Sequence, residues 1–233
     1  MTFICIGTFG QSISYNFSVD RTYRTLKAND REDSQDRINF RDSIYRPSIL
    51  HTKGVSFQFK LKENFFLSSD LSISTSGYQS ILRQKEPEFT QGEGVNINES
   101  KYIKRRNFLS IPIGLKYYFI EKRKFKAFVN AGISLNFLLY EKYIRYDYLS
   151  DNSINKDVEL SIAYFSPVGG NPDHITYSSL FEIGIYFPVK KDLYMEISPV
   201  FRKSIRHIHQ KSNWFYDEYI YSYGINFKIY RKF

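Results

Sequence analysis

The sequence YIYSYGINFKIYRKF, residues 219–233, alternates between two kinds of side chain. One parity is apolar or aromatic, and the other is mostly small or polar. Because successive side chains of a strand point to opposite faces, the segment predicts a strand with one face in lipid and the other in a polar interior. An aromatic last residue is typical of the closing strand of an outer-membrane β-barrel. The expected lipid-facing residues are Tyr219, Tyr221, Tyr223, Ile225, Phe227, Ile229 and Phe233, opposite Ser222, Gly224, Asn226, Lys228 and Lys232.

The composition excludes a helical membrane protein. The chain has 233 residues, of which 20 are Tyr and 21 are Phe, yet its mean hydropathy is only −0.42. No window approaches the roughly 20 consecutive apolar residues of a membrane helix. A barrel strand needs only about 9–11 residues to cross and exposes every second one to lipid, so a transmembrane barrel remains possible.

Residues 1–10, MTFICIGTFG, form a short apolar run that ends in a small-x-small pattern. We interpret this run as the remnant of a secretory signal peptide cleaved before Gln11, and residues 11–233 as the outer-membrane β-barrel domain. An ordinary first strand is the alternative. Cys5 is the only cysteine, so the cleaved domain would have no thiol for a disulfide, a metal or a nucleophile.

Period-two runs of Tyr, Phe, Ile, Leu and Val occur eight times. Three of the connections between them are short and charged, and four are long and polar. These features predict an all-β, eight-stranded antiparallel up-and-down transmembrane barrel with both termini in the periplasm. The expected strands span 12–25, 50–61, 64–78, 105–120, 125–146, 174–189, 192–207 and 219–233, and the long loops span 27–49, 79–104, 147–173 and 208–218.

Two prolines fall inside expected strands, Pro112 facing inward and Pro199 facing outward. Proline cannot donate a hydrogen bond to a neighbouring strand, and a closed barrel has no free edge. We therefore expect a bulge or a local widening at each proline.

Most of the net charge of +9 lies on one rim of this barrel. The rim with the tight turns carries eleven basic and three acidic residues, a net charge of +8. It would attract anionic phospholipid head groups by about 1 kcal/mol per basic residue. No helix suited to a nucleic-acid groove accompanies these residues, so nucleic-acid binding is not expected. The basic residues are Lys60, Lys62, Lys122, Arg123, Lys124, Lys126, Lys190, Lys191, Lys228, Arg231 and Lys232, and the acidic ones are Glu63, Glu121 and Asp192.

Four segments carry a family resemblance: FLSIPIGLKYYF (108–119), KAFVNAGISLNFLL (126–139), YMEISPVFRKSI (194–205) and YSYGINFKIYRKF (221–233). With them the chain resembles the PorT-like family of small bacterial outer-membrane β-barrels. The resemblance implies insertion among outer-membrane lipids by the barrel assembly machinery of a Gram-negative-type bacterium. That machinery favours an aromatic residue where this chain has Arg231. Some members assist protein secretion, but no residue here carries that role over.

Five charged residues, with Asp70 a further candidate, are expected to point into the barrel by the parity of their strands. Two carboxylates facing cations could form an acid/base site. An ion-pair plug is the preferred interpretation, because the lumen of eight strands is just filled by side chains and unpaired buried charges are costly. No aqueous channel is then expected. The five residues of this charge network are Lys116, Glu182, Glu196, Arg202 and Arg206.

One group of residues near the long-loop end could be catalytic. His209 and Ser212, with His207 and Glu218, would suit an outer-leaflet lipid A hydrolase. His209 and Ser212 lie three residues apart, on opposite faces of a continuous strand, so ordinary loop residues are the preferred interpretation. His207 and His209 could also bind a metal, but no third ligand has convincing spacing. We expect no catalytic site, no metal and no cofactor.

The function expected from the sequence is non-catalytic: a structural, anchoring or interaction role, with protein secretion or envelope assembly as candidate settings. Aromatic loop residues such as Trp214 would suit a protein or glycan partner, although they could equally anchor the barrel at the membrane interface. The alternatives are the lipid A hydrolase and a soluble, lipocalin-like ligand-binding barrel with its apolar side chains inside.

Overall fold

The computed structural model describes ten antiparallel strands. It covers residues 12–28, 38–39, 45–80, 83–84, 97–149, 153–162, 175–190, 192–205 and 216–231. The interpreted signal remnant, residues 1–10, lies outside this range. Among the described residues, no helix is long and apolar enough to cross a membrane. The strands are β1 (Ser12–Ala28), β2 (Tyr45–Lys62), β3 (Phe65–Ser80), β4 (Arg83–Gln84), β5 (Ile97–Lys122), β6 (Phe125–Leu149), β7 (Ile154–Ile162), β8 (Ile175–Lys190), β9 (Leu193–Ser204) and β10 (Tyr216–Arg231).

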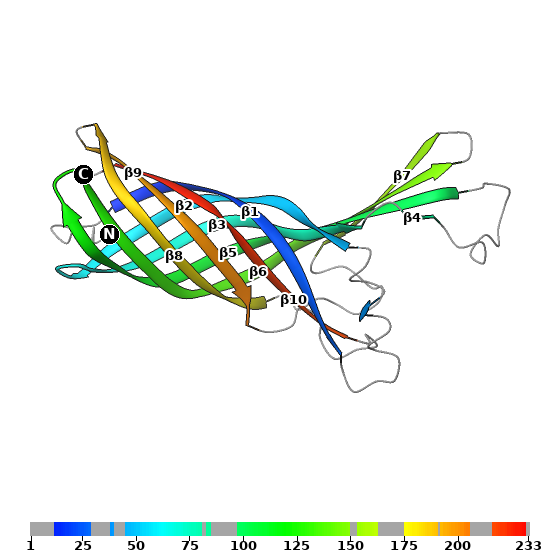
Figure 1. Ribbon diagram of the computed structural model, residues 1–233, viewed down its shortest axis with the longest axis horizontal. Coiled ribbons are helices and arrows are strands. Elements are labelled where there is room, and N and C mark those ends of the chain that lie inside the picture. The colour runs from blue at the N-terminus through cyan, green and yellow to red at the C-terminus, as the bar shows by residue number, and fades with distance from the viewer. Residues whose placement is uncertain are drawn as a thin grey trace, which may run out of the picture.

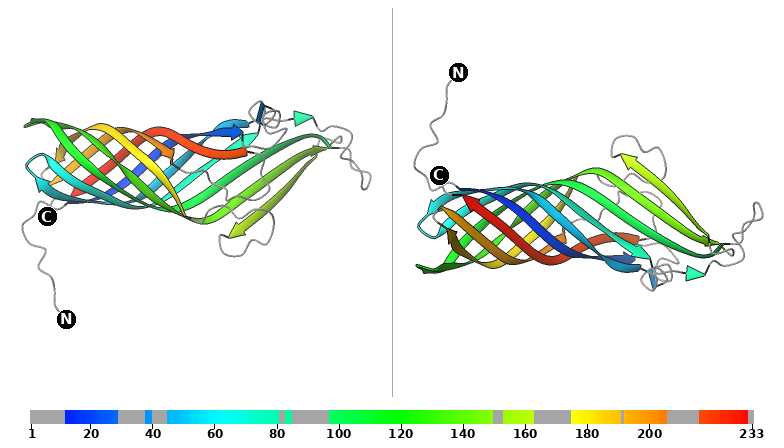
Figure 2. Two further views of the ribbon diagram at one scale, coloured as in Figure 1. Left: turned by 90° about the horizontal axis from the view of Figure 1, so that it is seen from below. Right: turned by 90° about the horizontal axis from the view of Figure 1, so that it is seen from above.

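Eight of the strands close into a ring (Figure 1). The ring order is β1, β2, β3, β5, β6, β8, β9 and β10, and β10 pairs with β1 from Tyr216 to Arg231. Figure 2 shows the blue first strand beside the red last strand. All eight correspond to strands expected from the sequence, so the fold prediction is confirmed. Two further strands, β4 and β7, lie within segments that were expected to be loops, and that part of the prediction is wrong.

The ring is strongly staggered. A path around the ring that steps from each residue to its direct partner on the next strand starts and ends on β1. It runs from Ser12 through Gln58, Ser68, Gly114, Gly132, Leu180, Arg202 and Ser222 to Thr22. One circuit therefore returns to β1 ten residues beyond its start. Such a stagger tilts every strand against the barrel axis, so the residues that meet inside the barrel come from distant positions in the sequence.

The faces of the strands divide sharply by polarity. On β10, Tyr223, Ile225, Phe227 and Ile229 are exposed, whereas Ser222, Asn226 and Lys228 are buried. Tyr219 and Tyr221 are partly exposed, and residues 232–233 lie outside the described chain. The same division holds on β1, where Ser14, Asn16, Ser18, Asp20 and Thr22 are all buried. An apolar outer wall around a polar interior suits lipid outside. The lipocalin-like alternative requires the reverse facing and is wrong.

Both prolines interrupt the ladder without a bulge. Pairing between β3 and β5 stops at Ser69–Ile113 and resumes at Ser72–Ser110 in the same register, with Pro112 facing the gap. Pairing between β8 and β9 stops at Glu182–Val200 and resumes at Ile185–Ile197, around Pro199. The opposite side of each proline stays paired, with Ser134 and Ile225 respectively. Of the two expected distortions, a bulge is absent, and the ladder is instead interrupted locally on one neighbouring strand at each proline.

Two strands continue far beyond the ring. β5 and β6 pair from Ile97–Leu149 down to their turn, but β5 pairs with β3 only as far as Ile103, and β6 pairs with β8 only as far as Phe137. Past these points β7 joins β6 and β4 joins β5. The result is a four-stranded sheet of β4, the outer parts of β5 and β6, and β7, which we call the distal sheet. It projects from the end of the barrel opposite the tight turns (Figures 1 and 2).

The facing of the strands can be tested with arginine at two depths. Ile225→Arg places a charge in the middle of the apolar wall and should lower the free energy of unfolding by about 2–4 kcal/mol, because arginine is costly at the bilayer midplane. Gln79→Arg, beyond the apolar wall, should cost about 0–1 kcal/mol. Urea titration in phospholipid vesicles, followed by the faster-migrating unheated band of a closed barrel, measures both. Equal stability of the two variants would contradict this facing.

Candidate functional site

A buried ion pair occupies the barrel near the tight-turn end. Lys116 of β5 donates from Nζ to Oε2 of Glu196 of β9 at 2.6 Å, and neither side chain reaches solvent. The Tyr230 hydroxyl donates to the same Oε2 at 2.9 Å and accepts from Gln58 Nε2 at 2.7 Å. The inward faces of four strands are thus joined through a single carboxylate. Such a pair fixes geometry more than it adds stability, because both charges have been removed from water.

Glu182 is held by amides rather than by a direct ion pair. Asn130 Nδ2 and Asn226 Nδ2 each donate to one of its carboxylate oxygens, both at 2.8 Å. The absent side chain of Gly114 leaves room here, since a Cβ would lie 2.6 Å from Asn130 Oδ1. Glu182 is therefore fully hydrogen-bonded within the barrel wall.

Lys228 requires a correction. It was predicted both on the inward face of the closing strand and among the basic rim residues, and the structure buries it in the lumen, 3.4 Å from Asp70 Oδ2. Its inward parity on β10 takes precedence over its nearness to the chain end. The rim predicted from the sequence therefore has ten basic residues, and its net charge falls from +8 to +7.

Aromatic rings close the barrel around the Lys116 pair. The aromatic floor comprises Tyr118, Phe128, Tyr186, Tyr194 and Tyr230. Tyr186 stacks on Tyr194 at 5.1 Å between ring centroids and meets Tyr230 edge-on at 5.6 Å. Tyr118 packs edge-on against Phe128 at 5.9 Å. Lys116 Nζ lies 4.1 Å from the centre of the Phe128 ring, a cation–π contact that partly compensates its burial.

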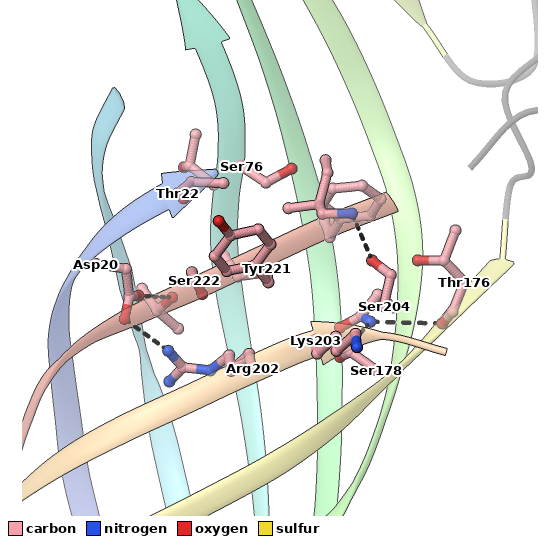
Figure 3. A pocket seen from close by; sticks show the side chains of 16 residues that line it. Asp20, Thr22, Ser76, Thr176, Ser178, Arg202, Lys203, Ser204, Tyr221 and Ser222 are labelled. Carbon is pink, nitrogen blue, oxygen red and sulfur yellow. Dashed lines mark hydrogen bonds and ion pairs between the residues drawn. The ribbon is translucent and has the colours of Figure 1, made fainter. Parts of the chain in front are cut away.

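Above the floor lies a hydroxyl-lined cavity (Figure 3). Arg202 crosses it and donates to Asp20 Oδ1 at 2.7 Å, and the other oxygen of Asp20 accepts from Thr52. The cavity measures about 70 Å³, and a neighbouring one of about 40 Å³ lies deeper in the barrel. These volumes hold a few water molecules each. Neither of these two cavities, lined by described residues, is large enough to serve as a channel for a solute.

A second charge cluster lies at the barrel mouth, beside the distal sheet. Arg106 of β5, fully buried, pairs with Glu141 at 2.6 Å and with Glu218 at 2.8 Å. Lys104 pairs with Glu141 at 2.9 Å. The outward apolar row of β5 ends at Leu109, so this cluster lies beyond the membrane-spanning part. Burial opposes ionisation of Glu141, but the neighbouring cations Arg106 and Lys104 hold its pKa below the ordinary value.

The predicted charge network is brought together only in part. Lys116 and Glu196 form a pair, and Glu182 lies in the same region, but Arg202 pairs separately with Asp20. Arg206 lies outside the described residues. Asp20, Tyr230 and Gln58 were not predicted as partners of these charges. A parity count along β1 and β10 could have shown that Asp20 and Tyr230 point inward.

The residues of the hydrolase alternative do not form a described site. His209 and Ser212 lie outside the described residues. Glu218, the carboxylate suggested for that group, is buried and paired with Arg106. His51, which lacks the spacing of a third metal ligand, is exposed on β2. Within the described part of the chain, no three His, Cys, Asp or Glu side chains are placed to hold a metal ion.

The basic rim lies at the tight-turn end. Lys122, Arg123, Lys124, Lys190 and Arg231 are all exposed there, whereas residues 191 and 232 are outside the described range. Lys126 is paired with Glu121 across the β5–β6 turn. The other exposed cations leave a positive surface around this end of the barrel.

The chain is similar to a known protein family and to several solved structures. The model of the family described as "Outer membrane protein beta-barrel domain" matches residues 9–194. No curated protein matches the chain. Among solved structures, the chain is similar to Neisserial surface protein A (TM-score 0.46, 8% identity, 96% of this chain and 97% of that chain). It is also similar to E. coli outer membrane protein W (0.41, 10%, 97% and 99%) and to Ail of Yersinia pestis (0.37, 10%, 96% and 99%).

Removal of one partner of the buried pair should destabilise the barrel strongly. Lys116→Met leaves Glu196 buried without its cation and should lower the free energy of unfolding by about 3–5 kcal/mol. The double variant Lys116→Met, Glu196→Gln should recover most of that loss. Lys122→Met, on the exposed rim, serves as the control and should change stability by about 0.5 kcal/mol or less. Urea unfolding in vesicles measures all three, and a double variant no more stable than Lys116→Met alone would refute the pairing.

Proposed function

Because the chain belongs to the family of outer membrane protein beta-barrel domains, we propose that this integral outer-membrane β-barrel is a non-catalytic anchor that presents its distal sheet to a partner outside the cell. The partner is a protein or a glycan. An accessory role in protein secretion or envelope assembly, as in the PorT-like family, is the form of this function that we favour. The barrel assembly machinery and the surrounding lipids are its partners during and after insertion.

The observation that carries the proposal is the continuation of β5 and β6 beyond the ring. A strand of about 9–11 residues crosses the membrane, yet β5 has 26 residues and β6 has 25. Their hydrogen-bonded ladder continues to Ile97–Leu149, where β7 extends the sheet. The described lumen is filled by charged and aromatic side chains and does not favour a pore, so the ordered projection is the feature best suited to an interaction.

The distal sheet has side chains suited to binding. Tyr102 and Tyr143 stack at 5.6 Å, and the Arg145 guanidinium lies 5.8 Å from the Tyr102 ring while its Nε donates to Asp147 at 2.8 Å. Tyrosine and arginine are enriched among residues that dominate binding energy. Val158 on β7 is exposed as well. An outer strand such as β7 also offers backbone groups to a partner strand.

The proposal includes an orientation. Tight turns and chain termini in the periplasm, with long segments outside, are the usual arrangement of such barrels. The basic rim would then face the inner leaflet, where anionic phospholipid head groups attract it. The distal sheet would project into the medium.

Cysteine labelling in intact cells tests this orientation. In a Cys5→Ser background, Val158→Cys should react with a membrane-impermeant maleimide in whole cells. The matched control Val189→Cys, similarly exposed but at the tight-turn end, should react only after the outer membrane is opened. Labelling of Val189→Cys alone in whole cells would reverse the orientation and refute the presentation of the distal sheet.

The absence of catalysis has its own test. Overexpression of the intact protein in a Gram-negative host should leave the mass spectrum of lipid A unchanged, because the carboxylate of the hydrolase alternative is paired with Arg106. Loss of acyl chains from lipid A would contradict the non-catalytic role, provided that Ser212→Ala abolishes the loss.

A further inference from the structure

A groove opens on the outer wall of the barrel near its mouth. It lies where β9 ends at Ser204, while β10 and β1 continue beside it. The groove has a volume of about 580 Å³ and is lined from four strands, among others by Lys27, Ser179, Phe201, Lys203, Tyr219 and Tyr221. Most of these side chains belong to the outward parity of their strands. The groove is therefore separate from the hydroxyl-lined cavity of the lumen.

The groove is positively charged. Lys27 and Lys203 line it, and its described lining holds no carboxylate. Arg21 lies on the same outward face of β1 as Lys27, six residues before it. Arg21, Lys27 and Lys203 are all exposed. Among the described residues, none of the three forms an ion pair. Asp217 stands opposite Lys27 in the β1–β10 register, so Arg21 and Lys203 are the better residues for a test.

Tyrosines hold this surface in place. Tyr23 stacks on Tyr221 at 5.1 Å and on Tyr223 at 5.3 Å, and the hydroxyls of Tyr23 and Tyr223 are 2.5 Å apart. The Arg21 guanidinium lies 5.5 Å from the Tyr23 ring, and Lys27 Nζ lies 5.1 Å from the Tyr219 ring. Tyrosines collect at the head-group level of a membrane because one end of the ring is apolar and the other is wet. The cations are therefore placed beside hydroxyl donors at that level.

The strand register fixes the depth of the groove. Phe201, Tyr223 and Arg21 are direct neighbours on β9, β10 and β1. One outward row further toward the mouth, Lys203, Tyr221 and Tyr23 are direct neighbours. Figure 3 shows Lys203 and Tyr221 on these two adjacent strands. The cations thus begin where the apolar wall ends, which is where lipid phosphates meet lipid tails.

We propose that this groove binds the phosphorylated head group of a glycolipid of the lipid A type in the outer leaflet. Arg21 and Lys203 would contact the phosphate, tyrosine hydroxyls would donate to phosphate or sugar oxygens, and acyl chains would lie along Phe201 and its neighbour Phe181, both exposed. The assignment of the leaflet rests on the proposed orientation of the barrel. The chemistry of the groove, cations above an apolar wall, does not depend on it.

Binding can be measured with the whole protein refolded in neutral detergent. The probe is bis-phosphorylated lipid A, and the comparison probe is the same glycolipid without phosphates. Native mass spectrometry gives the bound fraction over a titration. The variant Arg21→Gln, Lys203→Gln should bind lipid A about thirtyfold more weakly. The control Arg105→Gln, Lys156→Gln removes two exposed cations that lie outside both the groove and the basic rim and should bind as the parent does.

Each outcome decides the proposal. Weaker binding of the site variant alone, together with weak binding of the phosphate-free probe by the parent, supports it, and Lys203→Arg should retain most of the affinity. Equal loss in both double variants would show general charge attraction and overturn it, as would tight binding of the phosphate-free probe. If the site double variant fails to show the folded gel band, Arg21→Gln and Lys203→Gln are measured singly, with about fivefold loss expected for each. A reversed labelling pattern of Val158→Cys refutes the orientation without changing this binding measurement.

Discussion

Closure of the hydrogen-bonded ring is the constraint on which the rest of the structure depends. A lipid environment offers no partner for a free backbone amide or carbonyl, so a sheet can cross it only as a closed barrel. The sixteen-residue pairing of β1 with β10 meets this requirement across the two ends of the chain. The gaps opposite Pro112 and Pro199 are tolerated because each is confined to one neighbour and leaves the register unchanged. Once closed, eight strands leave a lumen that side chains must fill.

That filling is achieved by balanced charge. The described residues of the lumen and its mouth include six cations and six carboxylates, each group drawn from several strands. A balanced set avoids an uncompensated buried charge, which would cost several kcal/mol. The aromatic floor then separates the Lys116 pair from the tight-turn end. The charges of the interior are therefore paired with one another, whereas the cations of the rim are exposed, although both regions contain lysine. The cations are Arg24, Lys104, Arg106, Lys116, Arg202 and Lys228, and the carboxylates are Asp20, Asp70, Glu141, Glu182, Glu196 and Glu218.

Side-chain parity predicted the ring because it is a local property. The alternation of Tyr223, Ile225 and Phe227 with small or polar residues is visible without any partner strand. The same rule placed Lys228 on the interior face, and only its additional count among the rim residues was wrong. The partners could not be predicted in this way: Arg202 meets Asp20, 182 residues away, because of the ten-residue stagger, which no single strand encodes. β7 was missed although its sequence INKDVELSI alternates, because the segment is short and charged and Lys156 interrupts its apolar row.

Unequal strand length explains why the mouth has two different surfaces. β5 and β6 extend beyond their ring neighbours and stay paired with each other, so that side of the mouth continues as the distal sheet. β9 has only 12 residues and ends before β1 and β10 reach the mouth, so the opposite side of the mouth has the groove instead. The distal sheet carries stacked tyrosines and an arginine beyond the membrane-spanning part, whereas the groove places lysines at the edge of the apolar wall. If both proposals hold, a single barrel holds a lipid at one side of its mouth and offers a protein or glycan surface at the other, with no change in the eight strands that cross the membrane.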